Sequence, residues 1–184
     1  MKYLPLYSGM IMDNQGVNSG MILENASYPD ACILDKIEAY TGYSDKDVCI
    51  LEGFVNDWLT NAGFLGTWKD TGTDTVCGCV RNAIEYIFSQ KEDITLFVII
   101  DHYGKTTCST LSENSANKTQ YEFYNEIIKL CNSMGVHVIK QNEESEINEN
   151  TPSYLYDNIH LTDLGAKQSA QTIWSCMKKY NLNK

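Results

Sequence analysis

The chain has 184 residues, 14 basic and 24 acidic side chains, a net charge of −10 and a pI near 4.6. This acidic balance argues against a nucleic-acid backbone as partner. Arg81 is the only arginine, so an anion clamp built from arginines is not expected. With 43% apolar and 21% charged residues, the composition is that of a globular protein, and one domain over residues 1–184 is expected.

Seven cysteines are scattered through the sequence. Only one residue lies between Cys77 and Cys79, which is too tight for the usual zinc spacing, so buried reduced thiols rather than a zinc site are expected. The first residues lack the apolar core of a signal peptide, and no apolar run approaches 18 residues. We therefore expect a cytoplasmic chain without membrane contact, unless an upstream segment changes its destination.

The first third of the chain predicts one short strand, one helix and one buried strand. Met10–Met12 is a candidate strand, followed by a polar glycine turn that ends near Gly20. Residues 31–40 carry apolar side chains at helical spacing. Residues 47–51 form a short apolar run, typical of a buried strand, and the turn Gly53–Asp57 follows it.

The rest of the chain alternates helices and strands. The strongest strand signal is 94–100, a continuous β-branched run of the kind that is covered on both faces of a sheet. The remaining elements are helices over 76–90, 121–134 and 166–180 and a strand over 136–139, with polar loops between them. This alternation predicts a parallel sheet with helices on both faces.

In such a sheet, functional groups gather beyond the carboxyl ends of the strands. Near the end of the chain, Asp157 precedes His160 by three residues, in a loop that leads into the last helix. An aspartate that orients a histidine, leaving it free to act as a base, is half of a nucleophile triad. The alternative is that Asp157 caps a helix and that His160 is structural.

Other candidates follow the strand ends. Asn56 could donate to a developing oxyanion, and Gly20 could add a backbone N–H, although both residue types are also common in ordinary turns. Asp57, Asp101 and His102 are candidate substrate-lining residues. The three histidines lack metal-ligand spacing, so no metal site is expected.

Taken in order, Gly20, Gly53–Asp57 and the Asp157–His160 segment resemble three conserved blocks of the SGNH (GDSL-type) hydrolases. The Leu65–Thr67 loop and the helix around Tyr121 resemble the bacterial and phage-associated branch. The resemblance implies a flavodoxin-like three-layer α/β/α sandwich and serine-dependent hydrolysis of a small or carbohydrate-linked ester. It also implies His160 as base, Asp157 as its orienter, Gly20 and Asn56 as oxyanion donors, and no cofactor.

One block of the family pattern has no counterpart. The Gly-Asp-Ser sequence that carries the nucleophile at the end of the first strand is absent, and only 19 residues precede Gly20. Ser8 and Ser19 are the nearby serines. We therefore expect an N-terminally truncated domain that lacks its first strand, with a sheet edge open to pairing with another chain. A non-catalytic descendant that binds a carbohydrate or a protein is the alternative to an esterase, and a flavodoxin-like nucleotide binder lacks the necessary glycine loop.

Overall fold

The computed structural model describes residues 2–180 and 182. It contains a parallel three-stranded sheet in the order β1-β2-β3, formed by β1 (Val48–Glu52), β2 (Thr95–Ile100) and β3 (His137–Lys140). The register pairs Val48 with Thr95 in the first ladder and Phe97 with His137 in the second. The three strands therefore end at one edge, which we call the carboxyl edge.

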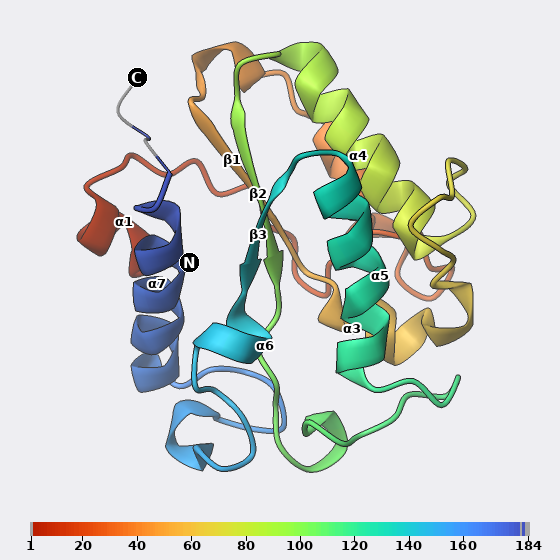
Figure 1. Ribbon diagram of the computed structural model, residues 1–184, viewed down its shortest axis with the longest axis vertical. Coiled ribbons are helices and arrows are strands. Elements are labelled where there is room, and N and C mark those ends of the chain that lie inside the picture. The colour runs from red at the N-terminus through yellow and green to blue at the C-terminus, as the bar shows by residue number, and fades with distance from the viewer. Residues whose placement is uncertain (1, 181, 183–184) are drawn as a thin grey trace.

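Helices cover both faces of this sheet, which gives the three-layer α/β/α architecture expected from the sequence (Figure 1). One face carries α2 (Ile33–Ala39), α3 (Val55–Thr60), α4 (Val76–Gln90) and α5 (Gln120–Ser133). The other carries α1 (Leu4–Ser8) and α7 (Asp163–Met177), and the short α6 (Gln141–Glu144) follows β3 directly. Among residues 2–180 and 182, no helix is long and apolar enough to cross a membrane.

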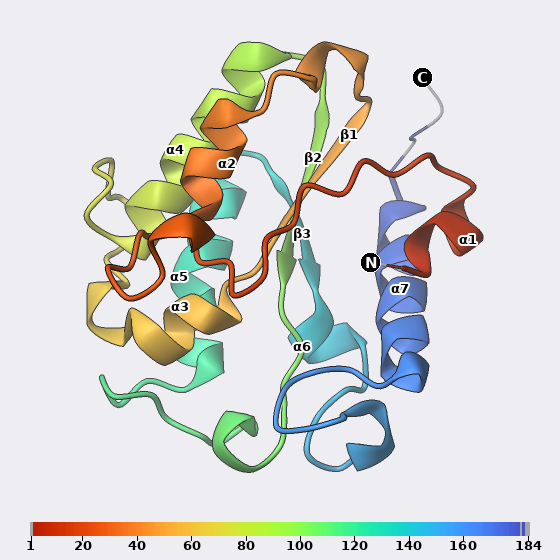
Figure 2. The ribbon, with the colours of Figure 1, turned by 180° about the vertical axis from the view of Figure 1, so that it is seen from behind.

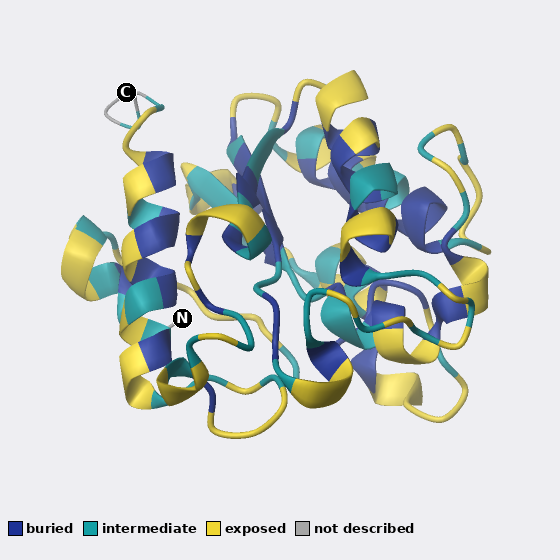
Figure 3. Cartoon of the chain, turned by 60° about the horizontal axis from the view of Figure 1, so that its bottom comes forward, coloured by how far each residue is buried: buried dark blue, intermediate teal, exposed yellow. Residues whose placement is uncertain are grey.

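The strand β2 divides the core because its side chains alternate between the two faces. Leu96, Val98 and Ile100 belong to the larger cluster under α4 and α5. Phe97 and Ile99 belong to the smaller cluster under α1 and α7. Figure 3 shows the buried side of these helices turned toward the strands, as expected for a central strand that is apolar throughout.

Two sequence expectations need correction. Met10–Met12 is not a strand: it belongs to an extended segment that crosses the sheet between α1 and α2 without a ladder partner (Figure 2). The last helix begins at Asp163 rather than Ala166, because the Thr162 hydroxyl caps it by accepting the Gly165 N–H at 3.1 Å.

Candidate active site

The predicted Asp157–His160 pair forms within one tight loop at the carboxyl edge. The Asp157 carboxylate lies 2.8 Å from His160 Nδ1 through one oxygen. Its other oxygen accepts the backbone N–H groups of Ile159 and His160, at 2.9 and 2.8 Å. These bonds hold the pKa of Asp157 well below its usual range, with the backbone donors as the leading cause.

This arrangement leaves one histidine nitrogen free. Ionised Asp157 accepts from Nδ1, so the neutral His160 ring carries its proton there and presents Nε2 as an acceptor. The His160 side chain is 78% exposed, so Nε2 is open to a reactant. The pair therefore has the geometry of a general base with its orienting carboxylate.

Backbone contacts fix the loop against its surroundings. Tyr156 N–H donates to the His160 carbonyl at 2.7 Å, which closes the loop. Lys105 N–H donates to the Asn158 carbonyl at 2.8 Å, and a Cβ on Gly104 would lie only 2.0 Å from that carbonyl oxygen. Gly104 therefore permits a close approach between the segment after β2 and the loop that carries His160, a role that sequence analysis missed.

The two predicted oxyanion donors lie together, where the turn that ends at Gly20 meets the first turn of α3. Asn56, in the first turn of α3, donates from Nδ2 to the Gly20 carbonyl at 3.1 Å. The Gly20 N–H donates to the Val17 carbonyl at 3.3 Å. The structure thus brings Gly20 and Asn56 into contact, with the Gly20 N–H engaged in a turn.

Asp57, a candidate substrate-lining residue, lies in the core and joins two segments of the chain. It is fully buried, and its carboxylate accepts the N–H groups of Ile22 and Leu23 at 2.8 and 3.1 Å. Asn61 donates a third bond at 3.0 Å. Burial raises the pKa of Asp57 to about 6 despite these donors. Asp57 therefore anchors the segment after Gly20 to α3.

Asp101 and His102 follow β2 at the carboxyl edge. Asp101 Oδ2 accepts the N–H groups of Phe54 and Val55, both at 2.9 Å, and so holds the start of α3. Burial and the neighbouring Glu52 raise the pKa of Asp101 to about 8. His102 donates from Nδ1 to the Tyr103 carbonyl at 2.9 Å. Burial lowers the pKa of His102.

Glu52 is a further residue that sequence analysis missed. It is the last residue of β1, its carboxylate accepts from Gln141 Nε2 at 3.2 Å, and burial raises its pKa. The sequence signal that could have identified Glu52 is a charged residue at the end of an otherwise apolar strand.

The serines give no completed triad. Ser8 ends α1 and its Oγ accepts the Met10 N–H, while Ser19 is an exposed turn residue with a φ of 58°. Among the described residues, no hydrogen bond joins either serine to His160. The same described part of the chain holds no group of three or more His, Cys, Asp or Glu side chains placed to bind a metal ion.

Solved structures share this fold. A possible lipase from Chitinophaga pinensis superposes with a TM-score of 0.73 at 15% identity, over 98% of this chain and 88% of that one. A family 3 carbohydrate esterase from Clostridium thermocellum superposes with a TM-score of 0.60 at 20% identity, over 97% of this chain and 83% of that one. A putative GDSL-like lipase from Bacteroides ovatus superposes with a TM-score of 0.59 at 18% identity, over 90% of this chain and 69% of that one.

No protein-family model matches the chain, and no curated protein matches it. These solved structures are all less than 25% identical to the chain, so their similarity shows a shared fold and nothing more. That fold is the three-layer α/β/α sandwich with a parallel sheet that was expected from the sequence.

Proposed function

We propose that the chain is an SGNH-type ester hydrolase domain whose substrate is a small ester or an acylated carbohydrate. The observation that carries this proposal is the 2.8 Å contact between Asp157 and the exposed His160 at the carboxyl edge. The fold is shared with a possible lipase and a carbohydrate esterase, which supports the substrate class.

In this proposal, His160 Nε2 takes the proton of the attacking hydroxyl and later gives it to the leaving alcohol. Asp157 holds the ring and stabilises the imidazolium that forms. The Gly20 N–H and the second Asn56 amide hydrogen stabilise the oxyanion, which requires Gly20 to release the Val17 carbonyl. The nucleophilic serine is not assigned within residues 1–184.

A specific observation favours a second candidate function. Since neither Ser8 nor Ser19 is hydrogen-bonded to His160 in the described part of the chain, the domain could bind an acylated carbohydrate or a protein without cleaving it. Binding of an acetylated xylo-oligosaccharide without release of acetate would support this candidate.

The first test is hydrolysis of p-nitrophenyl acetate by the 184-residue protein and its His160→Ala variant. If the parent protein hydrolyses the ester, the variant should lose about 100-fold or more in kcat/KM because it lacks the general base, and Ser8 and Ser19 would be the next residues to substitute. His137→Gln is the matched control, since His137 stacks on Tyr180 with ring centroids 3.9 Å apart and takes no part in the site. Equal rates in all three proteins would reject esterase activity of this chain.

A further inference from the structure

The candidate base lies on a short hairpin that has two faces. Tyr156 N–H donates to the His160 carbonyl at 2.7 Å, next to the antiparallel bridge between Leu155 and Leu161. Tyr156 and His160 are therefore opposite each other, one position nearer the turn than the bridge. Opposite residues of an antiparallel pair point their side chains to the same face, and successive residues alternate between faces. Tyr156 and His160 thus share one face of the hairpin, and the two leucines share the other.

The exposure of these side chains agrees with this arrangement. Leu155 is buried and Leu161 is half-buried, whereas Tyr156 is 81% exposed and the His160 side chain is 78% exposed. The Cβ atoms of such an opposite pair lie about 5 Å apart. The hairpin therefore turns its leucines inward and presents the phenol ring of Tyr156 beside the imidazole of His160.

The Tyr156 ring is not used by the rest of the described chain. Within residues 2–180 and 182, its hydroxyl makes no hydrogen bond and its ring pairs with no other aromatic ring. Tyr154 differs, because it is half-buried and a Cβ on Gly165 would lie only 2.1 Å from its carbonyl oxygen. Tyr154 thus packs against α7, while the ring of Tyr156 is available to a ligand.

Polar side chains accompany this ring. Asn158, at the tip of the hairpin, donates from Nδ2 to Thr107 Oγ1 at 3.3 Å, and both residues are exposed. An alkyl chain would leave such amide and hydroxyl groups without partners. A pyranose ring has an apolar C–H face that stacks on an aromatic ring and a hydroxyl rim that forms hydrogen bonds. The surface beside His160 therefore suits a sugar ring better than an alkyl chain.

The proposed mechanism fixes which part of an ester reaches this surface. His160 gives its proton to the leaving alcohol, so the alcohol part lies on the side of His160. The carbonyl oxygen of the acyl group lies beside Gly20 and Asn56, the proposed oxyanion donors. Tyr156, as the neighbour of His160, therefore faces the alcohol part.

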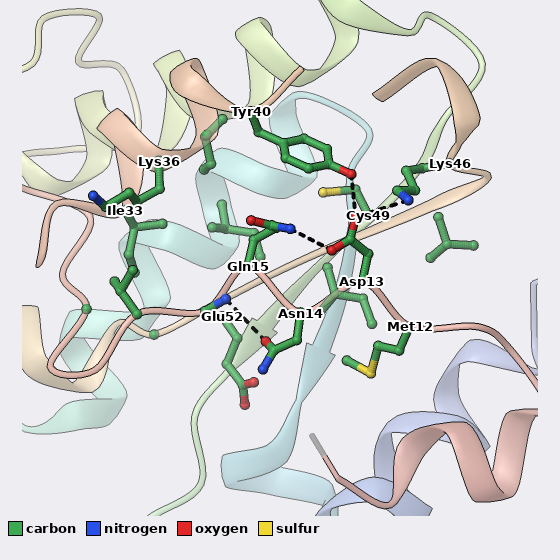
Figure 4. A pocket seen from close by; sticks show the side chains of 18 of the residues that line it. Met12, Asp13, Asn14, Gln15, Ile33, Lys36, Tyr40, Lys46, Cys49 and Glu52 are labelled. Carbon is green, nitrogen blue, oxygen red and sulfur yellow. Dashed lines mark hydrogen bonds and ion pairs between the residues drawn. The ribbon is translucent and has the colours of Figure 1, made fainter. Parts of the chain in front are cut away.

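An apolar groove of about 430 Å³ lies on the acyl side instead. Figure 4 shows Met12, Ile33 and Tyr40 in its lining, which also includes Gly20 and Asn56. Among the described residues that line it, none belongs to the segment 153–162. The groove thus offers apolar surface near the oxyanion donors, and the contact with the alcohol part is left to the hairpin.

We propose that Tyr156 is the stacking surface for a sugar ring that forms the alcohol part of the ester. Tyr156 then determines specificity for an acylated carbohydrate over an alkyl ester, without taking part in proton transfer. This inference rests on the ester hydrolase function proposed above, which assigns the alcohol to the side of His160.

The test measures acetate release from acetylated xylotriose and from ethyl acetate. Tyr156→Ala should lower kcat/KM for the sugar ester about tenfold or more, mainly through KM, and that for ethyl acetate less than about twofold. Tyr156→Phe keeps the ring and should stay close to the parent protein. Phe64→Ala is the matched control, because Phe64 is 61% exposed and belongs to the segment after α3, which lies away from the hairpin in Figures 1 and 2.

A binding measurement separates failure of this inference from failure of the esterase proposal. Acetylated xylotriose is titrated into each protein, and the amide NMR signals of Asn158 and His160 are followed, which requires no hydrolysis. We expect saturable shifts in the parent protein and binding about tenfold weaker in Tyr156→Ala. This result without acetate release would reject the esterase activity and retain the stacking surface.

Three outcomes would overturn the inference. Equal losses of Tyr156→Ala on both esters would show that Tyr156 only supports the position of His160. Absent binding of the sugar ester, or binding that Tyr156→Ala leaves unchanged, would exclude a stacking surface. A larger effect of Tyr156→Ala on acetylcholine than on the sugar ester would indicate a cationic alcohol held over the ring.

Discussion

Gly104 illustrates how one missing side chain positions the candidate base. The Asn158 carbonyl occupies the space that a Cβ would take, and the neighbouring Lys105 N–H binds that carbonyl. Asn158 lies between Asp157 and His160, so displacement of this contact would shift the loop that forms the pair. The glycine is required by close packing of two segments more than 50 residues apart.

We therefore expect Gly104→Ala to lower the free energy of unfolding by about 1–3 kcal/mol, through overpacking against a backbone atom. Urea denaturation measures this loss. Gly63→Ala is the control, because a Cβ there meets no atom within 4 Å and the backbone does not have a positive φ. Equal stability of the two variants would contradict the predicted close approach.

At the scale of elements, the helices and strands with strong local sequence patterns could be predicted, and those without such patterns could not. The apolar run at 94–100 became β2, and the helix predicted over 76–90 has those bounds in the structure. Both depend on side chains that are neighbours in sequence. Asp157 and His160 were candidates because of their spacing, but spacing does not give the path of a loop, so the 2.8 Å contact between them could not be predicted from sequence.

The elements that sequence analysis missed depend on distant contacts. The sequence predicts a turn over Gly53–Asp57, but residues 55–60 form α3, whose first turn is held by Asp101 from 46 residues away. The Met10–Met12 run suggested a strand, but Met10 and Met12 pack against the smaller core cluster instead. No local pattern specifies either outcome, because the partners come from other parts of the chain.

The start of α7 gives a prediction at this scale. Thr162→Ala removes the hydroxyl that accepts the Gly165 N–H, so the variant should be about 1 kcal/mol less stable. Thermal unfolding followed by circular dichroism checks this loss. Thr71→Ala is suitable for comparison because Thr71 is exposed and caps no helix. A cap role for Thr162 would be ruled out by an equal change in both variants.

At the scale of the whole molecule, buried carboxyl groups connect stability to pH. Burial raises the pKa of Asp101 to about 8, above the value near 3.9 of an unfolded aspartate. The folded state therefore holds a proton that the unfolded state releases. The contribution of Asp101 to the free energy of unfolding should therefore fall as the pH rises from about 4 to about 8.

Asp101→Asn should reduce this dependence, because the amide oxygen can still accept the Phe54 and Val55 N–H groups without carrying a charge. We expect the variant to exceed the parent protein in stability by about 1–3 kcal/mol at pH 8, and by less at pH 5. Urea denaturation across this range measures the difference. A variant that is less stable than its parent at pH 8 would show that the Asp101 charge is favourable in the fold.

The Asp157–His160 pair has a consequence for how such domains diverge. All of its hydrogen bonds lie within four consecutive residues, so its formation costs little loop-closure entropy and needs few distant contacts. The contact between Gly20 and Asn56 instead spans 36 residues and relies on the anchoring of α3. The geometry of the Asp157–His160 pair can thus persist when the contact between Gly20 and Asn56 is lost, because the two depend on different parts of the chain.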